Sequence, residues 1–344
     1  MSQKIKIGFN GSCLAEDQHG GWARYTSELI THLEKSFSDQ LEISIFENFS
    51  QQTHIIWEQK VLPQLCKDKG IQILHAPANG GLPYLGNFKK VLTIHDLFSE
   101  QMFSWPHAFK SIKNFKNSIR YKVDWVASLK AADLVITISE FSKQELLSYG
   151  LKTPISRIYE GVSPRIKGTA IPSQKPFLIY VGTFDSRKRT DDLINDFLKT
   201  TQNIDLVLVG REATLEEKRW SSPRLIFLEN LTDKILAGLY NAALAFITYS
   251  KSEGFGLPMV EAMSFGKPVL FNGGGAIPEI TGEGGLQVET GQLGPIIGKM
   301  LTDADYLKRI SENATKQAKN FQWEVTAQET FIAYKKLLNS VTKS

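Results

Sequence analysis

The pattern that most limits the fold of this chain is a series of short apolar runs separated by longer amphipathic segments. The runs are about five residues long and rich in isoleucine, leucine and valine. In order, they are IKIGFN, LEISIF, IQILHAP, KVLTIHD, DLVITIS, FLIYVG, IDLVLVG, RLIFLE, LAFITYS, KPVLFN and GLQV. Segments between them, such as GWARYTSELITHLEKS and DDLINDFLKT, are predicted to be helices. Apolar strands that alternate with helices are typical of a parallel sheet covered on both faces, so we predict an α/β fold.

The series of strands and helices breaks once, at residues 160–176. This stretch, EGVSPRIKGTAIPSQKP, contains three prolines and two glycines and has no periodic apolar stripe. Such a stretch is typical of a linker, and 344 residues are enough for two domains. We therefore predict an N-terminal domain over 1–165 and a C-terminal domain over 166–320. The last segment, 321–344, is amphipathic and is expected to pack back on the N-terminal domain as a helix.

The composition excludes several classes of protein. The chain is 42% hydrophobic and 22% charged, as is usual for a soluble globular protein. Its net charge of +4 suits an anionic ligand and is too small to indicate nucleic acid as a partner. Cys13 and Cys66 lie far apart, so their spacing indicates neither a disulfide framework nor a zinc site. We find no apolar leader and no apolar run of about 18 residues, and we expect a cytoplasmic location.

Two glutamates flank a glycine-rich stretch that begins a helix. The stretch SKSEGFGLPMVEAMSFGKPV follows a strand, and Pro258 fits the first turn of a helix. The first N–H groups of a helix favour phosphate, and glycine lets a ligand approach the backbone closely. Glu253 lies before the helix and Glu261 lies inside it. One carboxylate could then reach a sugar beyond the phosphates, and the other could accept two hydrogen bonds from a ribose diol. The alternative is a capping loop in which a glutamate complements the helix dipole.

A basic pair lies after another strand, in the stretch YVGTFDSRKRT. Arg187 and Lys188 stand together at a helix start, where they could neutralise a leaving nucleoside diphosphate. The alternative is an exposed basic helix start, which the helix dipole disfavours. The acidic stretch DAD at 303–305 lies in a polar helical region and is not a convincing metal motif. We therefore expect no metal ion and no cofactor, with the basic pair as the partner of the phosphates.

The glutamate stretch and the residues after it resemble a known family. EGFGLPMVEAMSFGKPVL, followed by GGGAIPEITGEGGLQV, resembles the signature of the retaining glycosyltransferases of family 4. Family-like stretches along most of the chain are GGWARYTSELI, VLTIHDLFSE, ADLVITISEFSKQEL, YVGTFDSRKRTDDLI and FQWEVTAQETFIAYKKLL. The resemblance implies the GT-B architecture, in which two Rossmann-like domains have parallel sheets that face a cleft. Domain 1–165 would be the acceptor side, and domain 166–320 the donor side.

The resemblance also implies roles for the residues of the glutamate stretch. Glu261 would bind the ribose of a sugar nucleotide, and Glu253 would lie beside the transferred sugar. Backbone amides of the intervening residues would hold the sugar and the diphosphate; these residues are Gly254, Phe255, Gly256 and Leu257. Some family members have an arginine where this chain has Thr183, so the diphosphate would rest mainly on the basic pair.

Three further positions are assigned by the resemblance. His95 ends an apolar strand and would contact the donor sugar, although a lone histidine is more often hydrogen-bonded in a loop; Asp96 has weaker support. Gly20 and Gly21 precede a helix and would face the donor, although the family usually has a glycine at the position of Ala23 here. Leu231 and Asp233 would hold the nucleobase, unless Thr232 or Asp233 only caps a helix.

The implied activity is transfer of a hexose, with retention of configuration and without a metal, from a nucleotide diphosphate sugar to a glycan or lipid-linked acceptor. The stretch TIHDL resembles mannosyltransferases of the family, so GDP-mannose is the first donor to consider, with UDP- or dTDP-sugars as the alternatives. A sugar-nucleotide epimerase of related architecture and a catalytically silent nucleotide-sugar-binding protein are the other interpretations. The segment 109–123 alternates basic and apolar residues at helical spacing. It fits either a solvated basic helix face or peripheral contact with the inner face of an anionic membrane.

Overall fold

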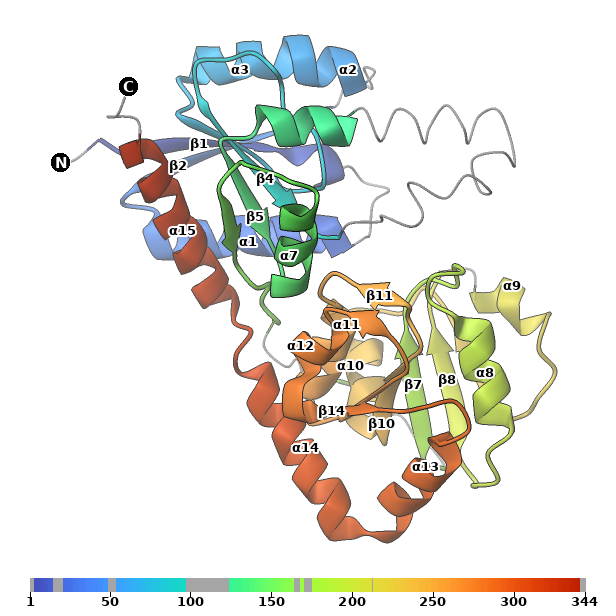
Figure 1. The fold of residues 1–344 in the computed structure, drawn as a ribbon. Coiled ribbons are helices and arrows are strands. Elements are labelled where there is room, and N and C mark those ends of the chain that lie inside the picture. The colour runs from blue at the N-terminus through green and yellow to red at the C-terminus, as the bar shows by residue number, and fades with distance from the viewer. Residues whose placement is uncertain are drawn as a thin grey trace. The chain divides into compact units, whose positions relative to one another are not determined.

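The computed structural model describes residues 3–14, 21–48, 54–96, 124–163, 168–169, 175–211 and 213–340. The chain divides into two compact units (Figure 1). Unit 1 contains Met1–Gly161 together with Trp323–Ser344, and unit 2 contains Val162–Gln322. In the described parts of the chain, each unit is built on a six-stranded parallel sheet with helices packed against it. The predicted segment 109–123 and Gly20 lie outside the described residues.

The sheet of unit 1 has the strand order β2-β1-β3-β4-β5-β6. Its strands are β1 (Ile5–Asn10), β2 (Leu41–Phe46), β3 (Ile73–Ala76), β4 (Lys89–Ile94), β5 (Leu134–Thr137) and β6 (Ile155–Arg157). Its helices are η1 (Gly11–Leu14), α1 (Gly21–Phe37), α2 (His54–Ile56), η2 (Trp57–Val61), α3 (Leu62–Lys69), a segment over 124–131, α7 (Glu140–Ser148) and α15 (Trp323–Asn339). Every residue of β3 and β5 is buried, as expected of central strands with both faces covered.

The last helix, α15, belongs to unit 1, although it follows the whole of unit 2 in the sequence. It packs against α1, where the rings of Phe37 and Phe331 stack with centroids 4.2 Å apart. Trp323 and Tyr334 of the same helix are almost completely buried. The amphipathic pattern of this segment is therefore satisfied by a buried face within unit 1.

The sheet of unit 2 has the strand order β14-β12-β10-β7-β8-β9. Its strands are β7 (Phe177–Val181), β8 (Asp205–Val209), β9 (Leu225–Leu228), β10 (Ala245–Thr248), β12 (Val269–Phe271) and β14 (Gly285–Gln287). A separate pair joins β11 (Ser252–Glu253) to β13 (Gly274–Gly275). Its helices are α8 (Thr190–Leu198), α9 (Ala213–Glu217), α10 (Asp233–Ala242), α11 (Leu257–Ser264), α12 (Ile277–Thr281), η3 (Gly282–Gly284), α13 (Leu293–Thr302) and α14 (Ala304–Ala318).

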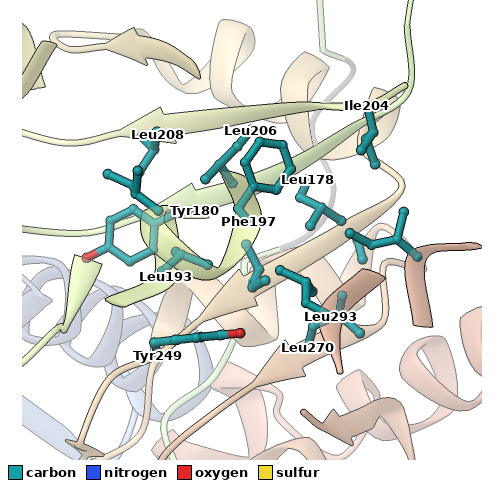
Figure 2. Close-up of a cluster of buried hydrophobic side chains, with 14 of the residues drawn as sticks. Leu178, Tyr180, Leu193, Phe197, Ile204, Leu206, Leu208, Tyr249, Leu270 and Leu293 are labelled. Atoms are coloured by element: carbon teal, nitrogen blue, oxygen red, sulfur yellow. The ribbon is translucent and has the colours of Figure 1, made fainter. Parts of the chain in front are cut away.

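One core of unit 2 forms where α8 and α13 cover the sheet. Figure 2 shows Leu178, Leu206 and Leu270 from the strands meeting Phe197 of α8 and Leu293 of α13. All five side chains have no exposed surface. Burial of a leucine or phenylalanine side chain stabilises the fold by roughly 1.5–3 kcal/mol, so this layer holds the sheet and the two helices together.

Each apolar run predicted to be a strand forms one, and β6, β11 and β13 are additions. β6 has three half-buried residues and lies at the edge of its sheet, so its sequence lacks a continuous apolar run. β11 and β13 have two residues each, too few for such a run. The stretch 160–176 is only partly described, but Glu160 is 3% exposed and belongs to unit 1. Within the described residues, no helix combines the length and the hydropathy needed to cross a membrane.

Candidate active site

The strand order of unit 2 indicates where a ligand would bind at the edge of its sheet. Proceeding from β7, the chain adds β8 and β9 on one side and then β10, β12 and β14 on the other. The direction changes between β7 and β10, and in open parallel sheets ligands bind at such a switch point, beyond the carboxyl ends of the strands. The loops that follow β7 and β10 contain both the predicted basic pair and the glutamate stretch.

The loop after β7 is folded by a short series of hydrogen bonds. The buried Tyr180 hydroxyl donates to the carbonyl of Thr183 at 2.5 Å. The Thr183 hydroxyl donates to one Asp185 oxygen at 2.6 Å, and the other Asp185 oxygen accepts from the N–H of Arg187 at 3.0 Å. Aspartate commonly turns the backbone in this way. Thr183 therefore shapes the loop that positions the basic pair.

The basic pair meets the first glutamate directly. Lys188 Nζ donates to Glu253 Oε1 at 2.5 Å, and Arg187 Nη1 lies 3.4 Å from Glu253 Oε2. Arg187 Nη1 also donates to the carbonyl of Ser252 at 3.0 Å. The three charged side chains are 13–18% exposed, so they are neither in open water nor sealed in the core. The predicted phosphate partners and the predicted sugar partner form one cluster.

The charge state of Glu253 follows from this cluster. Burial by itself would raise the pKa of the carboxyl, but Lys188 and Arg187 lower that pKa below its ordinary value of 4.5. Glu253 is therefore ionised at neutral pH. It is an acceptor for hydrogen bonds and cannot act as a general acid in this state.

The backbone around Glu253 is held by β13. Ser252 and Glu253 pair in parallel with Gly274 and Gly275. Gly275 has φ +71°, and a Cβ there would collide with the Ser252 hydroxyl and with the backbone of Glu253. The N–H of Lys251 donates to the carbonyl of Arg187 at 2.9 Å, which ties the two loops together. The backbone of Glu253 is therefore fixed by its neighbours, independently of the partners of its carboxylate.

Helix α11 begins at Leu257, after the short turn that follows Glu253. Gly256 is its N-cap with φ +88°, and Pro258 lies in the first turn, as predicted. Phe255 is 2% exposed and packs edge-on against Phe321, so its side chain is part of the core. The first N–H groups of a helix have no partner within it and carry partial positive charge. With Gly254 and Leu257 on either side, the loop offers backbone amides beside the two cations, which suits a phosphate.

Glu261 lies inside α11 and is 9% exposed. One of its carboxylate oxygens accepts a hydrogen bond from the Tyr240 hydroxyl of α10 at 3.1 Å. Tyr240 stacks on Phe265 with ring centroids 5.8 Å apart, so this tyrosine is fixed by packing. Sequence reasoning did not find Tyr240, because its partner lies 21 residues away and only the packing of α10 on α11 joins them.

The start of α10 supports the capping interpretation of its first residues. The Thr232 hydroxyl accepts from the N–H of Ile235 at 3.4 Å, as an N-cap does. Asp233 is exposed, and Leu231 is half-buried.

Among the described residues, non-glycine residues with positive φ are Arg189 and Asn230, which follow β7 and β9. Such strained backbone is common in ligand-binding loops.

Unit 1 contains its own charged cluster, at the carboxyl end of its sheet. His95 follows β4 and is 5% exposed. Its Nδ1 lies 2.8 Å from Glu160 Oε1, and its Nε2 lies 2.7 Å from the carbonyl of Pro77. A carbonyl only accepts, so Nε2 donates, and Nδ1 then donates to the carboxylate. Both ring nitrogens are occupied within unit 1.

The pKa of His95 agrees with this geometry. Burial would lower the pKa, but the hydrogen bond and charge of Glu160, with the Pro77 carbonyl, raise it above 6.5. His75 in the same unit behaves in the opposite way, since burial, with the nearby charge of His95, lowers its pKa to about 3. We therefore describe His95 as a buried imidazolium and His75 as a neutral ring.

A line of buried polar groups continues from His95 to α15. The ring of Tyr25 stands edge-on to His95 with centroids 4.7 Å apart, and its hydroxyl lies 3.3 Å from that of Thr93. Thr93 is 2.7 Å from His75 Nε2, and His75 Nδ1 is 2.6 Å from the Tyr334 hydroxyl. These groups connect α1, β4, β3 and α15 in the core, where an unsatisfied polar group would be costly.

Asp96 and Gly21, two further residues predicted for this site, lie in different environments. Asn79 accepts from the N–H of His95 at 2.7 Å and donates to Asp96 Oδ1 at 3.0 Å, so Asp96 helps to hold the loop after β4. Gly21 is the first residue of α1, and a Cβ there would meet no heavy atom of the described residues within 4 Å.

Two family models match the chain. "Glycosyltransferase Family 4" matches residues 34–165, and "Glycosyl transferases group 1" matches residues 164–317. Among solved structures, sucrose-phosphate synthase from Thermosynechococcus elongatus has a TM-score of 0.74 at 21% identity and covers 98% of this chain and 100% of that chain. WaaG, a glycosyltransferase of lipopolysaccharide biosynthesis, has a TM-score of 0.67 at 16% identity and covers 95% and 98%. The chain is a GT-B glycosyltransferase of the family 4 type.

Curated relatives of this glycosyltransferase include mannosyltransferases. The O-antigen chain mannosyltransferase B of Escherichia coli is 28% identical over 295 residues, which are 77% of this chain and 74% of that protein. The serotype-specific mannosyltransferase WbdA of Escherichia coli is 24% identical over 254 residues. These are 65% of this chain and 31% of WbdA, so the chain spans less than a third of that relative's length.

Sequence reasoning on this glycosyltransferase missed Glu160 and the contact between Glu253 and the basic pair. Glu160 stands at the start of a glycine- and proline-rich stretch, which indicated a linker and not a buried ion pair. Glu253 and Lys188 are 65 residues apart, and nothing in either motif indicates that they touch. Among the described residues, no group of three or more histidine, cysteine, aspartate or glutamate side chains is arranged to hold a metal ion.

Proposed function

We propose that this glycosyltransferase transfers mannose from GDP-mannose to a glycan or lipid-linked acceptor, with retention of configuration and without a metal ion. The observation that carries the proposal is the cluster of Arg187, Lys188 and Glu253 at the switch point of unit 2, beside the start of α11. The cluster combines fixed cations with backbone amides, which are the groups that a diphosphate needs.

The cations would act on the leaving group. As the bond between the sugar and the diphosphate breaks, negative charge grows on the phosphate oxygens. Arg187, Lys188 and the first N–H groups of α11 would stabilise that charge without rearrangement of the backbone. Because the cations are protein side chains, no metal ion is required for this step.

The carboxylate would act on the sugar. Glu253 is ionised and accepts hydrogen bonds, so it can orient the hydroxyl groups of a hexose attached to the diphosphate. The leaving diphosphate would take the proton of the acceptor hydroxyl on the same face of the sugar, which leads to retention. Glu261 would accept from the ribose, in exchange for or in addition to its bond from Tyr240.

His95 would have a positioning role in this scheme. Its ring nitrogens are occupied by Glu160 and Pro77, so contact with the donor sugar through the ring would require one of these bonds to open. We therefore propose that the ion pair of His95 holds the end of β4 and the loop after this strand.

The choice of mannose is supported by relatives that are named mannosyltransferases. The competing donor is a UDP-sugar, since the structure of HepE from Anabaena contains UDP and glucose and has a TM-score of 0.71 at 19% identity to this chain. Likeness at that identity concerns the fold alone, so the mannosyltransferase relatives decide our proposal.

The test is thermal unfolding with GDP, UDP and dTDP. A ligand at 100 times its dissociation constant stabilises the folded state by about 2.7 kcal/mol, so the matching nucleotide should raise the melting temperature clearly. GDP should do so, and turnover of GDP-mannose with an added glycan acceptor should then give the α-linked product by NMR. A shift with UDP alone would contradict the mannose donor. Conversion of the donor without acceptor would indicate an epimerase, and binding without any conversion a silent binding protein.

Metal independence has its own test. Transfer should continue in excess EDTA, because Arg187 and Lys188 supply the positive charge. The control is a metal-dependent transferase in the same buffer, which should stop. If EDTA abolished transfer and magnesium or manganese restored it, the basic pair would not be sufficient.

A further inference from the structure

The carboxylate of Glu253 is bound by both cations that are proposed to bind the diphosphate. It contacts both Lys188, at 2.5 Å, and Arg187, at 3.4 Å, with one oxygen on each. A phosphate oxygen makes the same kind of contact with the same two groups. An internal carboxylate therefore already satisfies the proposed diphosphate partners.

The positive charge of the loop after β7 is largely neutralised by neighbouring carboxylates. Arg187 and Lys188 contribute two positive charges, and Glu253 and Asp185 contribute two negative charges. Asp185 Oδ1 lies 3.9 Å from Arg187 Nε, and its side chain is 42% exposed. The third cation of the run, Arg189, is bound by Asp192 at 2.7 Å and by Asn272 at 3.1 Å. An incoming diphosphate must therefore compete with a carboxylate for the pair.

Glu253 is the stronger competitor of the two acids. Its side chain is 13% exposed and is bound at hydrogen-bond distance, whereas Asp185 faces water and lies beyond that distance from the guanidinium Nε. Ion pairs in open solvent contribute little, and shielded ones contribute more. To release the cations, the Glu253 carboxylate must find another partner, and its backbone remains fixed by β13.

We infer that Glu253 is a specificity-determining residue that sets the preference of this site for the intact sugar nucleotide over the bare nucleoside diphosphate. When the diphosphate carries a hexose, its phosphate oxygens bind Arg187 and Lys188, and a hydroxyl group of the hexose donates a hydrogen bond to Glu253. A bare diphosphate binds the cations and supplies no sugar hydroxyl, so Glu253 loses two charged partners and keeps only the hydrogen bond with the Ser250 side chain. The inference rests on the proposed function, and it implies that the spent diphosphate is released more readily than the donor is.

The experiment is calorimetric binding to the wild-type protein, to Glu253→Gln and to a matched control. Glutamine keeps the shape of the side chain but removes the charge that competes for Arg187 and Lys188. The probes are GDP and GDP-mannose, and UDP and UDP-glucose, without acceptor. Wild-type protein should bind the sugar nucleotide more tightly than the bare diphosphate. Glu253→Gln should bind the bare diphosphate about tenfold or more tightly than wild type does, with no comparable gain for the sugar nucleotide.

Asp192→Asn is the matched control, because it also removes one negative charge, but from the carboxylate that binds Arg189 and not from the one that binds Arg187 and Lys188. Its affinity for the diphosphate should stay within about twofold of wild type. An equal gain in this control would overturn the inference, since general loss of negative charge would then explain the result. Unchanged or weaker diphosphate binding by Glu253→Gln, with normal binding by wild type, would overturn the inference and leave the proposed function standing.

The remaining outcomes are also decisive. If neither wild type nor Glu253→Gln bound any of the four probes, both the proposed function and the inference would fail. If Glu253→Gln did not fold, as judged by its circular dichroism, the wild-type ratio alone would decide. A bare diphosphate that bound wild type as tightly as its sugar nucleotide would overturn the inference, and a clearly weaker one would support it.

Discussion

Each unit of this glycosyltransferase holds a carboxylate against a cation at the carboxyl end of its sheet, but the two clusters are built differently. His95 and Glu160 of unit 1 are 5% and 3% exposed, and both ring nitrogens are bound. In unit 2, the side chains of Arg187, Lys188 and Glu253 are 13–18% exposed.

The difference in burial suits one ion pair to a structural role and the other to ligand binding. A charge in the core must keep its partner, because no water can replace it, so the pair in unit 1 holds backbone in place. A charge near the surface can exchange its partner for a ligand, so the cluster in unit 2 is suited to binding. The comparison predicts that changes in unit 1 act on stability and that changes in unit 2 act on affinity.

The largest effect is expected from His95→Ala. Glu160 would be left as a buried carboxylate without its partner, which typically costs about 3–5 kcal/mol of unfolding free energy. Urea denaturation followed by fluorescence measures the loss. The double variant His95→Ala with Glu160→Gln is the control, and it should recover part of the loss because the lone charge is removed. A loss below about 1 kcal/mol would remove the contrast between the clusters.

The next effect is a loss of affinity in unit 2. Lys188→Gln should weaken binding of the nucleoside diphosphate by about ten- to a hundredfold, since a hydrogen bond to a charged group is worth roughly 1.5–3 kcal/mol. Calorimetry measures the affinity, and Lys199→Gln, which removes a charge at the end of α8, should leave it unchanged. Equal losses in both variants would mean that only the overall charge matters.

A pH dependence should distinguish the two histidines of unit 1. The folded pKa of His95 is raised, so its stabilising contribution is complete below about pH 6.5 and is lost as the pH rises through the folded pKa. The folded pKa of His75 is lowered to about 3, so its effect has the opposite sign, and stability falls as the pH drops below about 6.5. The groups that face these rings are Glu160, Asp96, Tyr25, Thr93 and Tyr334.

The measurement is urea denaturation of wild type, His95→Gln and His75→Gln from about pH 5.5 to about 9. The advantage of wild type over His95→Gln should shrink as the pH rises. Its advantage over His75→Gln should shrink as the pH falls. The same pH trend in both variants would contradict the assignment of one charged and one neutral ring.

The smallest effect is expected on the stability of Glu253→Gln. Arg187 and Lys188 are 18% and 15% exposed, so water can partly replace the carboxylate, and loss of its charge should change the unfolding free energy by no more than about 1–2 kcal/mol. Glu160→Gln, the same substitution in the buried cluster, is the comparison and should cost more. A loss of about 3 kcal/mol or more in Glu253→Gln would show that this carboxylate holds the loops together, as Glu160 holds β4.

Much of the candidate site could be predicted because its signals are local. The αL glycine, the proline in the first turn and the glutamates around them lie within a few residues of one another, and the structure places Gly256 and Pro258 at the start of α11. Thr232 as an N-cap is also local, because the hydroxyl acts on an N–H three residues later. The partners of Glu253, Glu261 and His95 are 65, 21 and 65 residues away, and no local pattern contains them.

The sequence by itself determined the parallel α/β class and the place of the loops that follow β7 and β10, since alternating apolar runs and helices leave few other ways to bury these side chains. Only the tertiary structure decided which charges meet. The order of β7 and β10 in the sheet brings Lys188 to Glu253, and the burial of β4 and of the chain after β6 brings His95 to Glu160. Exposure then decides what each pair does, because water can replace a partner at the edge of a sheet and cannot do so in the core.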